Sequence, residues 1–281
     1  MSISFIVATY ITNDIQLRQF KRCIDSIVKY SKYNNIYIIN NSIDLYDNEK
    51  LNNLLEKYEN IIIKTCSSKL LGGTCFTDIY KLILEVEDNC DYFFIMQDSM
   101  FLNKQIKDLS YVKDVQFLWH FTNHRLHWDN IILPSSDFNN QNNIKCLTDL
   151  IEYYLKTYYI KDKDFLSYAL NALKNKDTWC GCFGICSIIT KNAIYQIDKK
   201  SSIINIYNNI HNTEISIVNE SIFALLCHYY YPQDYEKSFD GLYYDGITVN
   251  KNSNKSFDNE DNLLLLAANE YLSKVSFQRL N

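Results

Sequence analysis

The stretch "YFFIMQDSMFL", Tyr92 to Leu102, contains one acid in an otherwise apolar segment. A run of apolar and aromatic residues leads to Asp98, and more apolar residues follow Ser99. Burying an unpaired ionised carboxylate costs at least several kcal/mol, so Asp98 does not suit a strand interior. We therefore expect a buried strand that ends at Asp98.

Three similar apolar runs precede this one, and segments with helical spacing separate them. Strands are expected at 3–10, 35–42, 60–66 and 91–98, and helices at 15–31, 48–59 and 78–88, the last capped by Thr77. Strands that are apolar throughout and joined by helices are typical of a parallel sheet covered on both faces. The sequence thus predicts an α/β fold with a mostly parallel central sheet.

The second half of the chain is less regular. We expect a strand and turn over 115–128, a loop, strand and helix start over 178–197, and helices at 146–160, 163–175, 212–231 and 262–275. The sequence has no internal repeat and no linker rich in Pro, Gly or Ser. It therefore predicts one compact domain.

Composition excludes some classes of partner. A net charge of −5 gives no basic footprint for nucleic acid. No apolar run reaches the about 18 residues of a membrane span. The nine cysteines are an odd number and no signal peptide is evident, which favours free thiols in a soluble, cytoplasmic protein. The many Asn, Ile, Lys and Tyr residues suggest an AT-rich source, such as a large DNA virus or a bacterium.

Polar residues follow several of the predicted strands. In parallel α/β sheets, ligands bind beyond the carboxyl ends of the strands. Thr9, Tyr10, Asn41, Asp98 and the pair Gly72-Gly73 should therefore gather along one edge.

The order of these segments resembles the GT-A fold of nucleotide-sugar-dependent glycosyltransferases, in particular the large inverting family 2. The resemblance covers roughly residues 3–102 well and 178–228 loosely. Its motifs are "VATY" at 7–10, "RCIDSI" at 22–27, "INNSID" at 39–44, "QDS" at 97–99, "WCGCFG" at 179–184 and "NES" at 219–221.

The resemblance implies transfer of a sugar, as by a hexosyltransferase, from a nucleotide-diphosphate donor such as a UDP-sugar to a hydroxyl of a glycan or other acceptor. Residues 1–102 would form the donor half and 103–281 the acceptor half. The nucleoside would be framed by Thr9, Tyr10, Asn41 and Asp44, and the donor sugar or ribose by Gly72, Gly73 and Asp78.

The resemblance also implies the chemistry. Asp98 would lie at the diphosphate and bind Mn²⁺ or Mg²⁺, which prefer oxygen ligands. Glu220 would be the general base of an inverting transfer, with Asp177 in reserve. Trp179 and Gly181 would contact the acceptor.

The chain departs from the family at its acidic motif, where Gln97 and Ser99 flank the single acid Asp98. One carboxylate would hold a metal weakly. A second metal hypothesis uses His120, His124, His127 and His228, and alternatively Arg125 or Lys191 would neutralise the leaving diphosphate.

Other interpretations of these residues stay open. Asp98 can cap a turn, Glu220 can be an exposed helical acid, Trp179 can pack in the core, and Cys180, Cys182 and Cys186 suit structural thiols better than zinc ligands. The chain can also be a relative that binds a nucleotide or glycan without turnover. A sugar-1-phosphate nucleotidyltransferase ranks lower, because no Gly-rich loop follows the first strand.

Overall fold

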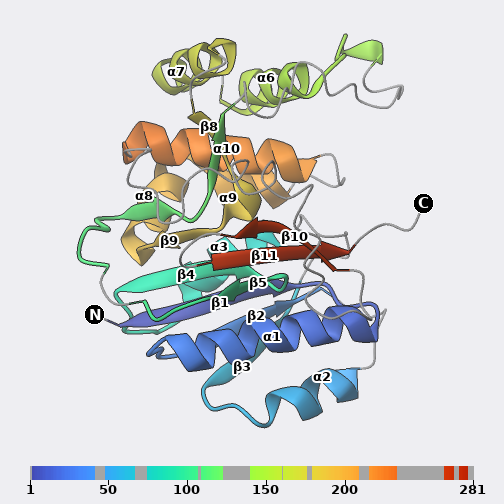
Figure 1. The fold of residues 1–281 in the computed structure, drawn as a ribbon. Coiled ribbons are helices and arrows are strands. Elements are labelled where there is room, and N and C mark those ends of the chain that lie inside the picture. The colour runs from blue at the N-terminus through green and yellow to red at the C-terminus, as the bar shows by residue number, and fades with distance from the viewer. Residues whose placement is uncertain are drawn as a thin grey trace.

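The computed structural model describes residues 2–41, 48–66, 75–106, 109–122, 140–159, 161–175, 179–208, 215–232, 263–268 and 272–277. Its centre is a six-stranded sheet with helices on both faces (Figure 1). The strands, in spatial order, are β3 (Ile61–Thr65), β2 (Ile36–Asn40), β1 (Ile3–Thr9), β4 (Tyr92–Gln97), β9 (Ser187–Ile189) and β6 (Val115–Phe117).

The first four strands are parallel, and β9 runs antiparallel to both of its neighbours. The prediction of an α/β fold with a mostly parallel sheet is therefore confirmed. The four parallel strands also lie where the apolar runs predict them. β1, β2 and β4 are buried along most of their length, whereas β3 is the edge strand and leaves Ile62 and Ile63 exposed.

Helices cover the sheet on two sides. On one side lie α1 (Asp14–Tyr30) and α2 (Asn48–Leu55), and on the other α3 (Phe76–Glu85), α8 (Lys191–Ser201), α9 (Ile203–Asn208) and α10 (Ile215–Tyr230). Figure 1 shows α6 (Leu147–Tyr158) and α7 (Lys163–Lys174) beyond α10. Successive residues of β4 serve different cores: Phe93 and Ile95 pack with α3 and α10, whereas Phe94 and Met96 pack with α1.

Two helix starts show how local sequence sets the ends. The side chain of Asn13 accepts a hydrogen bond from the backbone N–H of Gln16, which caps α1. The predicted cap of α3 at Thr77 is wrong, because the helix starts at Phe76 and Cys75 holds the cap position. Phe76 and Thr77 are both buried, so packing against the core favours a helix that already includes these two residues.

The predicted C-terminal helix at 262–275 is also wrong. This segment contains β10 (Leu263–Ala268) and β11 (Leu272–Phe277), an antiparallel pair. β11 also pairs with β5 (Met100–Leu102), which comes just after the Asp98 turn. A short apolar run is compatible with either a strand or a helix. Here the segment forms strands because β5 offers an edge for pairing, and the periodicity of the sequence does not indicate that partner.

A small second sheet joins β7 (His120–Thr122) to β8 (Trp179–Cys182). The structure thus places a strand where the sequence predicted a loop at Trp179, and a short turn of 3₁₀-helix, η2 (Phe183–Ile185), leads on to β9. No helix in the described part of the chain has the length and apolarity needed to cross a bilayer. The eight cysteines whose side chains the structure describes are free thiols.

Candidate functional site

The Asp98 carboxylate points toward the end of the first strand. Its Oδ2 accepts a hydrogen bond of 2.8 Å from the Thr9 hydroxyl and one of 3.0 Å from the Tyr10 backbone N–H. The Asp98 N–H donates to the carbonyl of Ala8 at 3.0 Å. Asp98 is half-buried while Thr9 is almost completely buried, so the acid lies at the rim of the sheet with paired polar partners.

The other parallel strands end at the same edge. Asn41 donates its backbone N–H to the Thr9 carbonyl at 3.0 Å, and Cys66 donates its own to the Asn40 carbonyl at 2.9 Å. The Asp78 carboxylate, in the first turn of α3, accepts from the Cys66 thiol at 2.8 Å. Asp78 therefore reaches this edge too.

A buried thiol lies between the two acids. Burial is the main cause that raises the pKa of Cys75 to about 12, and the negative charges of Asp78 and Asp98 raise it further. A thiol in this environment stays protonated and is a poor nucleophile. Cys75 is therefore not expected to act as a nucleophile at this edge.

Gln97 and Gly184 fit closely together beside the acid. Gly184, in η2, has a φ of +59°, and a Cβ atom built on it would lie 2.6 Å from Nε2 and 2.9 Å from Cδ of Gln97. The absence of a side chain at Gly184 thus makes room for the amide of Gln97. Sequence reasoning treated Gln97 only as a missing acid, although the "GCFG" spacing was a signal for a close approach.

Glu220 lies on α10, which packs against β8 and η2. The predicted apolar face of this helix is buried, including Val218, Ile222 and Phe223, while Glu220 is half-buried. The pKa of the Cys182 thiol is raised by burial and then by nearby groups, among which is Glu220. The helix that carries Glu220 thus packs against β8, the strand that contains Gly181.

Two buried thiols, Cys182 and Cys186, flank η2. The Cys182 Sγ donates to the Cys186 carbonyl at 3.4 Å. The η2 turn contacts both β4, which ends next to Asp98, and α10, which carries Glu220.

The described residues of this edge do not form a metal centre by themselves. Within the described ranges no three His, Cys, Asp or Glu side chains are grouped to hold a metal ion. Asp98 contributes one carboxylate, and its Oδ2 already accepts two hydrogen bonds. Mg²⁺ takes about six oxygen ligands. A cation here would need most of its ligands from the diphosphate and water.

The predicted position of Lys191 is wrong. Lys191 donates to the Val86 carbonyl at 2.8 Å, at the edge where β4 begins, because β9 runs antiparallel and carries the chain away from the acids. It therefore does not lie at the diphosphate. His228 forms a hydrogen bond between its Nδ1 and the Tyr168 hydroxyl, which joins α10 to α7. The side chains of the other three histidines of the metal hypothesis are outside the described part of the chain, so that hypothesis stays a prediction.

Several predicted site residues lie outside the described part of the chain. These are Asp44, Gly72, Gly73, His124, Arg125, His127 and Asp177. The backbone is described at His120, Trp179 and Cys180, which lie on β7 and β8, but their side chains are not. Gly181 is buried and pairs with Phe121 of β7.

No protein-family model and no curated protein matches the chain. Among solved structures, mouse xyloside xylosyltransferase 1 in its apo form is 8% identical over 82% of this chain and 82% of its own, with a TM-score of 0.45. The bifunctional glycosyltransferase WbbM, also in its apo form, is 10% identical over 78% of this chain and 37% of its own, with a TM-score of 0.44.

TarS of S. aureus in complex with UDP is 16% identical over 37% of this chain and 29% of its own, with a TM-score of 0.26. The chain thus spans well under half the length of the TarS and WbbM chains. Xyloside xylosyltransferase 1 and WbbM are glycosyltransferases by name, the class that the sequence motifs resemble. Identities this low concern the fold alone and carry no substrate to this chain.

Proposed function

We propose that this protein is a glycosyltransferase that moves a sugar from a nucleotide-diphosphate donor, most simply a UDP-sugar, to a hydroxyl acceptor. One observation carries the proposal: the half-buried Asp98 carboxylate is held by Thr9 and Tyr10 where the parallel strands end. This is the edge at which α/β sheets bind nucleotides. The motif order in the sequence supports the same reaction.

The polar groups of this edge are assigned to the donor. Thr9, Tyr10 and Asn41 frame the nucleoside, and Asp78 borders the donor sugar or ribose. Asp98 orients the Tyr10 turn through its Oδ2 and lies beside the diphosphate. Asp44, Gly72 and Gly73 complete the donor site in this proposal, and Mn²⁺ or Mg²⁺ would bind with the diphosphate, neutralising its charge.

The acceptor side of the proposal uses α10 and β8. The acceptor hydroxyl attacks the anomeric carbon, the bond from that carbon to the diphosphate oxygen breaks, and the diphosphate leaves with the electron pair. Glu220 takes the hydroxyl proton as general base. Because the hydroxyl attacks from the face opposite the leaving diphosphate in one displacement, the anomeric carbon is inverted. Trp179 and Gly181, on β8, would contact the acceptor.

Donor binding is tested first with a thermal-shift panel of UDP-, GDP-, CDP- and dTDP-sugars, each with and without Mn²⁺. A ligand present at a hundred times its dissociation constant stabilises the native state by about 2.7 kcal/mol, which is measurable. We expect a shift with one nucleotide class, larger when Mn²⁺ is present. No shift with any member of the panel would contradict the proposal.

Glu220→Gln tests the base. The amide keeps the size of the side chain but cannot take a proton, so we expect transfer to fall by about 10²–10⁴-fold while donor binding is kept. The matched control is Glu85→Gln, an exposed acid at the end of α3, which should keep full activity. Full transfer by Glu220→Gln would remove Glu220 from the mechanism.

A second candidate function is binding of a nucleotide or glycan without turnover. The single carboxylate of the strand-end motif favours it, since Gln97 replaces an acid. Donor hydrolysis without acceptor distinguishes the two functions. A transferase releases free sugar from its donor slowly, whereas a binding protein shows saturable affinity and releases none.

A further inference from the structure

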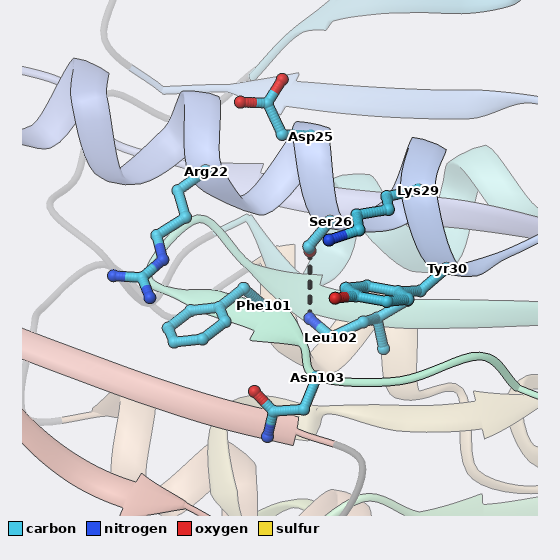
Figure 2. Close-up of a pocket in the computed structure, with 8 residues that line it drawn as sticks. All are labelled: Arg22, Asp25, Ser26, Lys29, Tyr30, Phe101, Leu102 and Asn103. Carbon is cyan, nitrogen blue, oxygen red and sulfur yellow. Dashed lines mark hydrogen bonds between the residues drawn. The ribbon is translucent and has the colours of Figure 1, made fainter. Parts of the chain in front are cut away.

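A hollow of about 330 Å³ lies between the second half of α1 and strand β5 (Figure 2). It belongs to no residue of the donor or acceptor site proposed above. Its lining is formed by Arg22, Asp25, Ser26, Lys29, Tyr30, Phe101, Leu102 and Asn103. The volume is at the lower end of the range of about 300–1,000 Å³ for small-molecule sites.

The floor of the hollow is fixed by hydrogen bonds. The hydroxyl of Ser26 accepts from the Leu102 backbone N–H at 3.0 Å and donates to the Cys23 carbonyl at 2.6 Å. Ser26 and Leu102 are both buried, so this bridge ties the helix to the strand without solvent between them. A ligand would thus meet a preformed surface, which lowers the entropy cost of binding.

Two cations stand over aromatic rings in this hollow. The Arg22 guanidinium carbon lies 4.0 Å from the centre of the Phe101 ring, and the Lys29 ammonium lies 4.7 Å from the centre of the Tyr30 ring. Arg22 and Lys29 are seven positions apart on the helix, or about 10 Å along its axis. Their charges therefore lie toward the two ends of one hollow.

The one acid in the lining is already compensated. The Asp25 carboxylate pairs with the Lys21 ammonium at 2.5 Å and accepts from the Tyr58 hydroxyl at 2.6 Å. In Figure 2 it lies on the other side of the helix from Phe101 and Asn103. Among the lining residues, Arg22 and Lys29 supply the positive charge, which favours an anion.

We propose that this hollow is a second binding site, for a small phosphorylated molecule with a ring. The phosphate binds Arg22, whose planar fork of N–H donors matches phosphate oxygens, or Lys29 at the other end. The ring packs between the aromatic side chains Phe101 and Tyr30, and Asn103, which directly follows β5, lines the hollow beside them. The proposal does not depend on the transferase activity.

Isothermal titration calorimetry with ribose 5-phosphate as the probe tests the site, with ribose and inorganic phosphate as its separated parts. We expect saturable binding of ribose 5-phosphate, weaker binding of phosphate and none of ribose. Affinity should fall as NaCl is raised, because the charges at the rim are screened. The amide NMR signals of Leu102 and Asn103 should shift during the titration.

Substitutions then locate the binding. Arg22→Met and Lys29→Met keep the alkyl stems and remove the charges, and we expect each to weaken ribose 5-phosphate binding by about tenfold or more. Lys32→Met, at an exposed lysine just after α1, is the charge-matched control and should bind normally. Thr9→Val, at the donor edge, should also bind normally.

Unchanged affinity in a folded Arg22→Met, Lys29→Met double variant would overturn the proposal, as would loss of binding in Thr9→Val with no loss in the double variant. Thermal unfolding of each variant shows whether it is folded. If Arg22→Met does not fold because its contact with Phe101 is lost, the proposal is tested by the affinity of Lys29→Met and the NMR titration. Unchanged affinity in Lys29→Met, with no shift of the Leu102 and Asn103 signals, would overturn it.

Discussion

At the scale of single residues, the hydrogen bond from Thr9 to Asp98 holds the candidate site together. Thr9→Val keeps the shape of the side chain but removes the donor 2.8 Å from Asp98 Oδ2. A half-buried acceptor that loses a partner costs about 1–3 kcal/mol, so we expect that loss in urea denaturation. Thr157→Val removes an exposed hydroxyl that bonds the Tyr153 carbonyl on α6, and this control should cost less than about 0.5 kcal/mol.

The close fit of Gly184 to Gln97 gives a second prediction at this scale. Gly184→Ala places a Cβ 2.6 Å from the Gln97 amide nitrogen at a backbone φ of +59°. We expect a loss of about 1–3 kcal/mol in the free energy of unfolding, from backbone strain and the clash together. Adding Gln97→Ala should recover the part due to the clash. If the double variant were no more stable than the sum of the singles predicts, the clash would not be real.

At the scale of elements, Asp88, which precedes β4, joins the amino ends of β1 and β2. Its Oδ2 accepts from the Ser4 hydroxyl at 2.6 Å, the Asn35 amide at 2.9 Å and the Tyr37 hydroxyl at 2.9 Å. Burial of the carboxyl raises its pKa, but these hydrogen bonds together outweigh burial, so the pKa of Asp88 lies below the ordinary value of 3.8.

The direction of this shift predicts a pH dependence. A lowered pKa in the folded state means that ionised Asp88 stabilises the protein above about pH 4, and that this contribution is lost as the pH falls through the folded-state pKa. Asp88→Asn should therefore be less stable than the wild type at pH 7, by about 1 kcal/mol, and the difference should shrink below pH 4. Urea denaturation at several pH values measures it. A difference that stays constant down to pH 3 would contradict the assignment.

The elements also show what the sequence could and could not predict. The parallel strands and helices α1, α6, α7 and α10 follow from apolar periodicity, because each buries a continuous apolar face of its own. The hairpin of β10 and β11 could not be predicted in this way. Leu272 and Ser273 pair with Leu102 and Phe101, about 170 residues earlier in the chain, and that partner sets the structure of the segment.

At the scale of the whole molecule, sheet topology explains which site residues were predictable. Parallel strands bring Thr9, Asn41 and Asp98 to one edge whatever the loops do, so their neighbourhood follows from the fold class. To predict where Lys191 lies, one must know that β9 runs antiparallel, which no local sequence pattern indicates. To predict the contact between Gln97 and Gly184, one must know the path of η2. Periodicity in the sequence therefore cannot predict the contacts of β9, an antiparallel strand from the second half of the chain that pairs with β4.

The shared sheet leads to a prediction about cooperativity. Phe94 stacks on Phe5 with ring centres 5.0 Å apart in the core below α1, and Phe223 stacks on Tyr80 at 5.6 Å in the core on the opposite face. Since β4 supplies residues to both cores, neither core can lose its packing without disturbing the strand that supports the other. We expect the described elements to unfold together.

Phe94→Leu and Phe223→Leu test this coupling. Each should lower the free energy of unfolding by about 1–2 kcal/mol, and the double variant should show roughly their sum, because the two rings make no contact. Circular dichroism and tryptophan fluorescence, followed in the same urea titration, should give coincident transitions for all three variants. Two separated transitions, with Phe94→Leu moving only one and Phe223→Leu only the other, would mean that the two cores fold independently and that the sheet does not couple them.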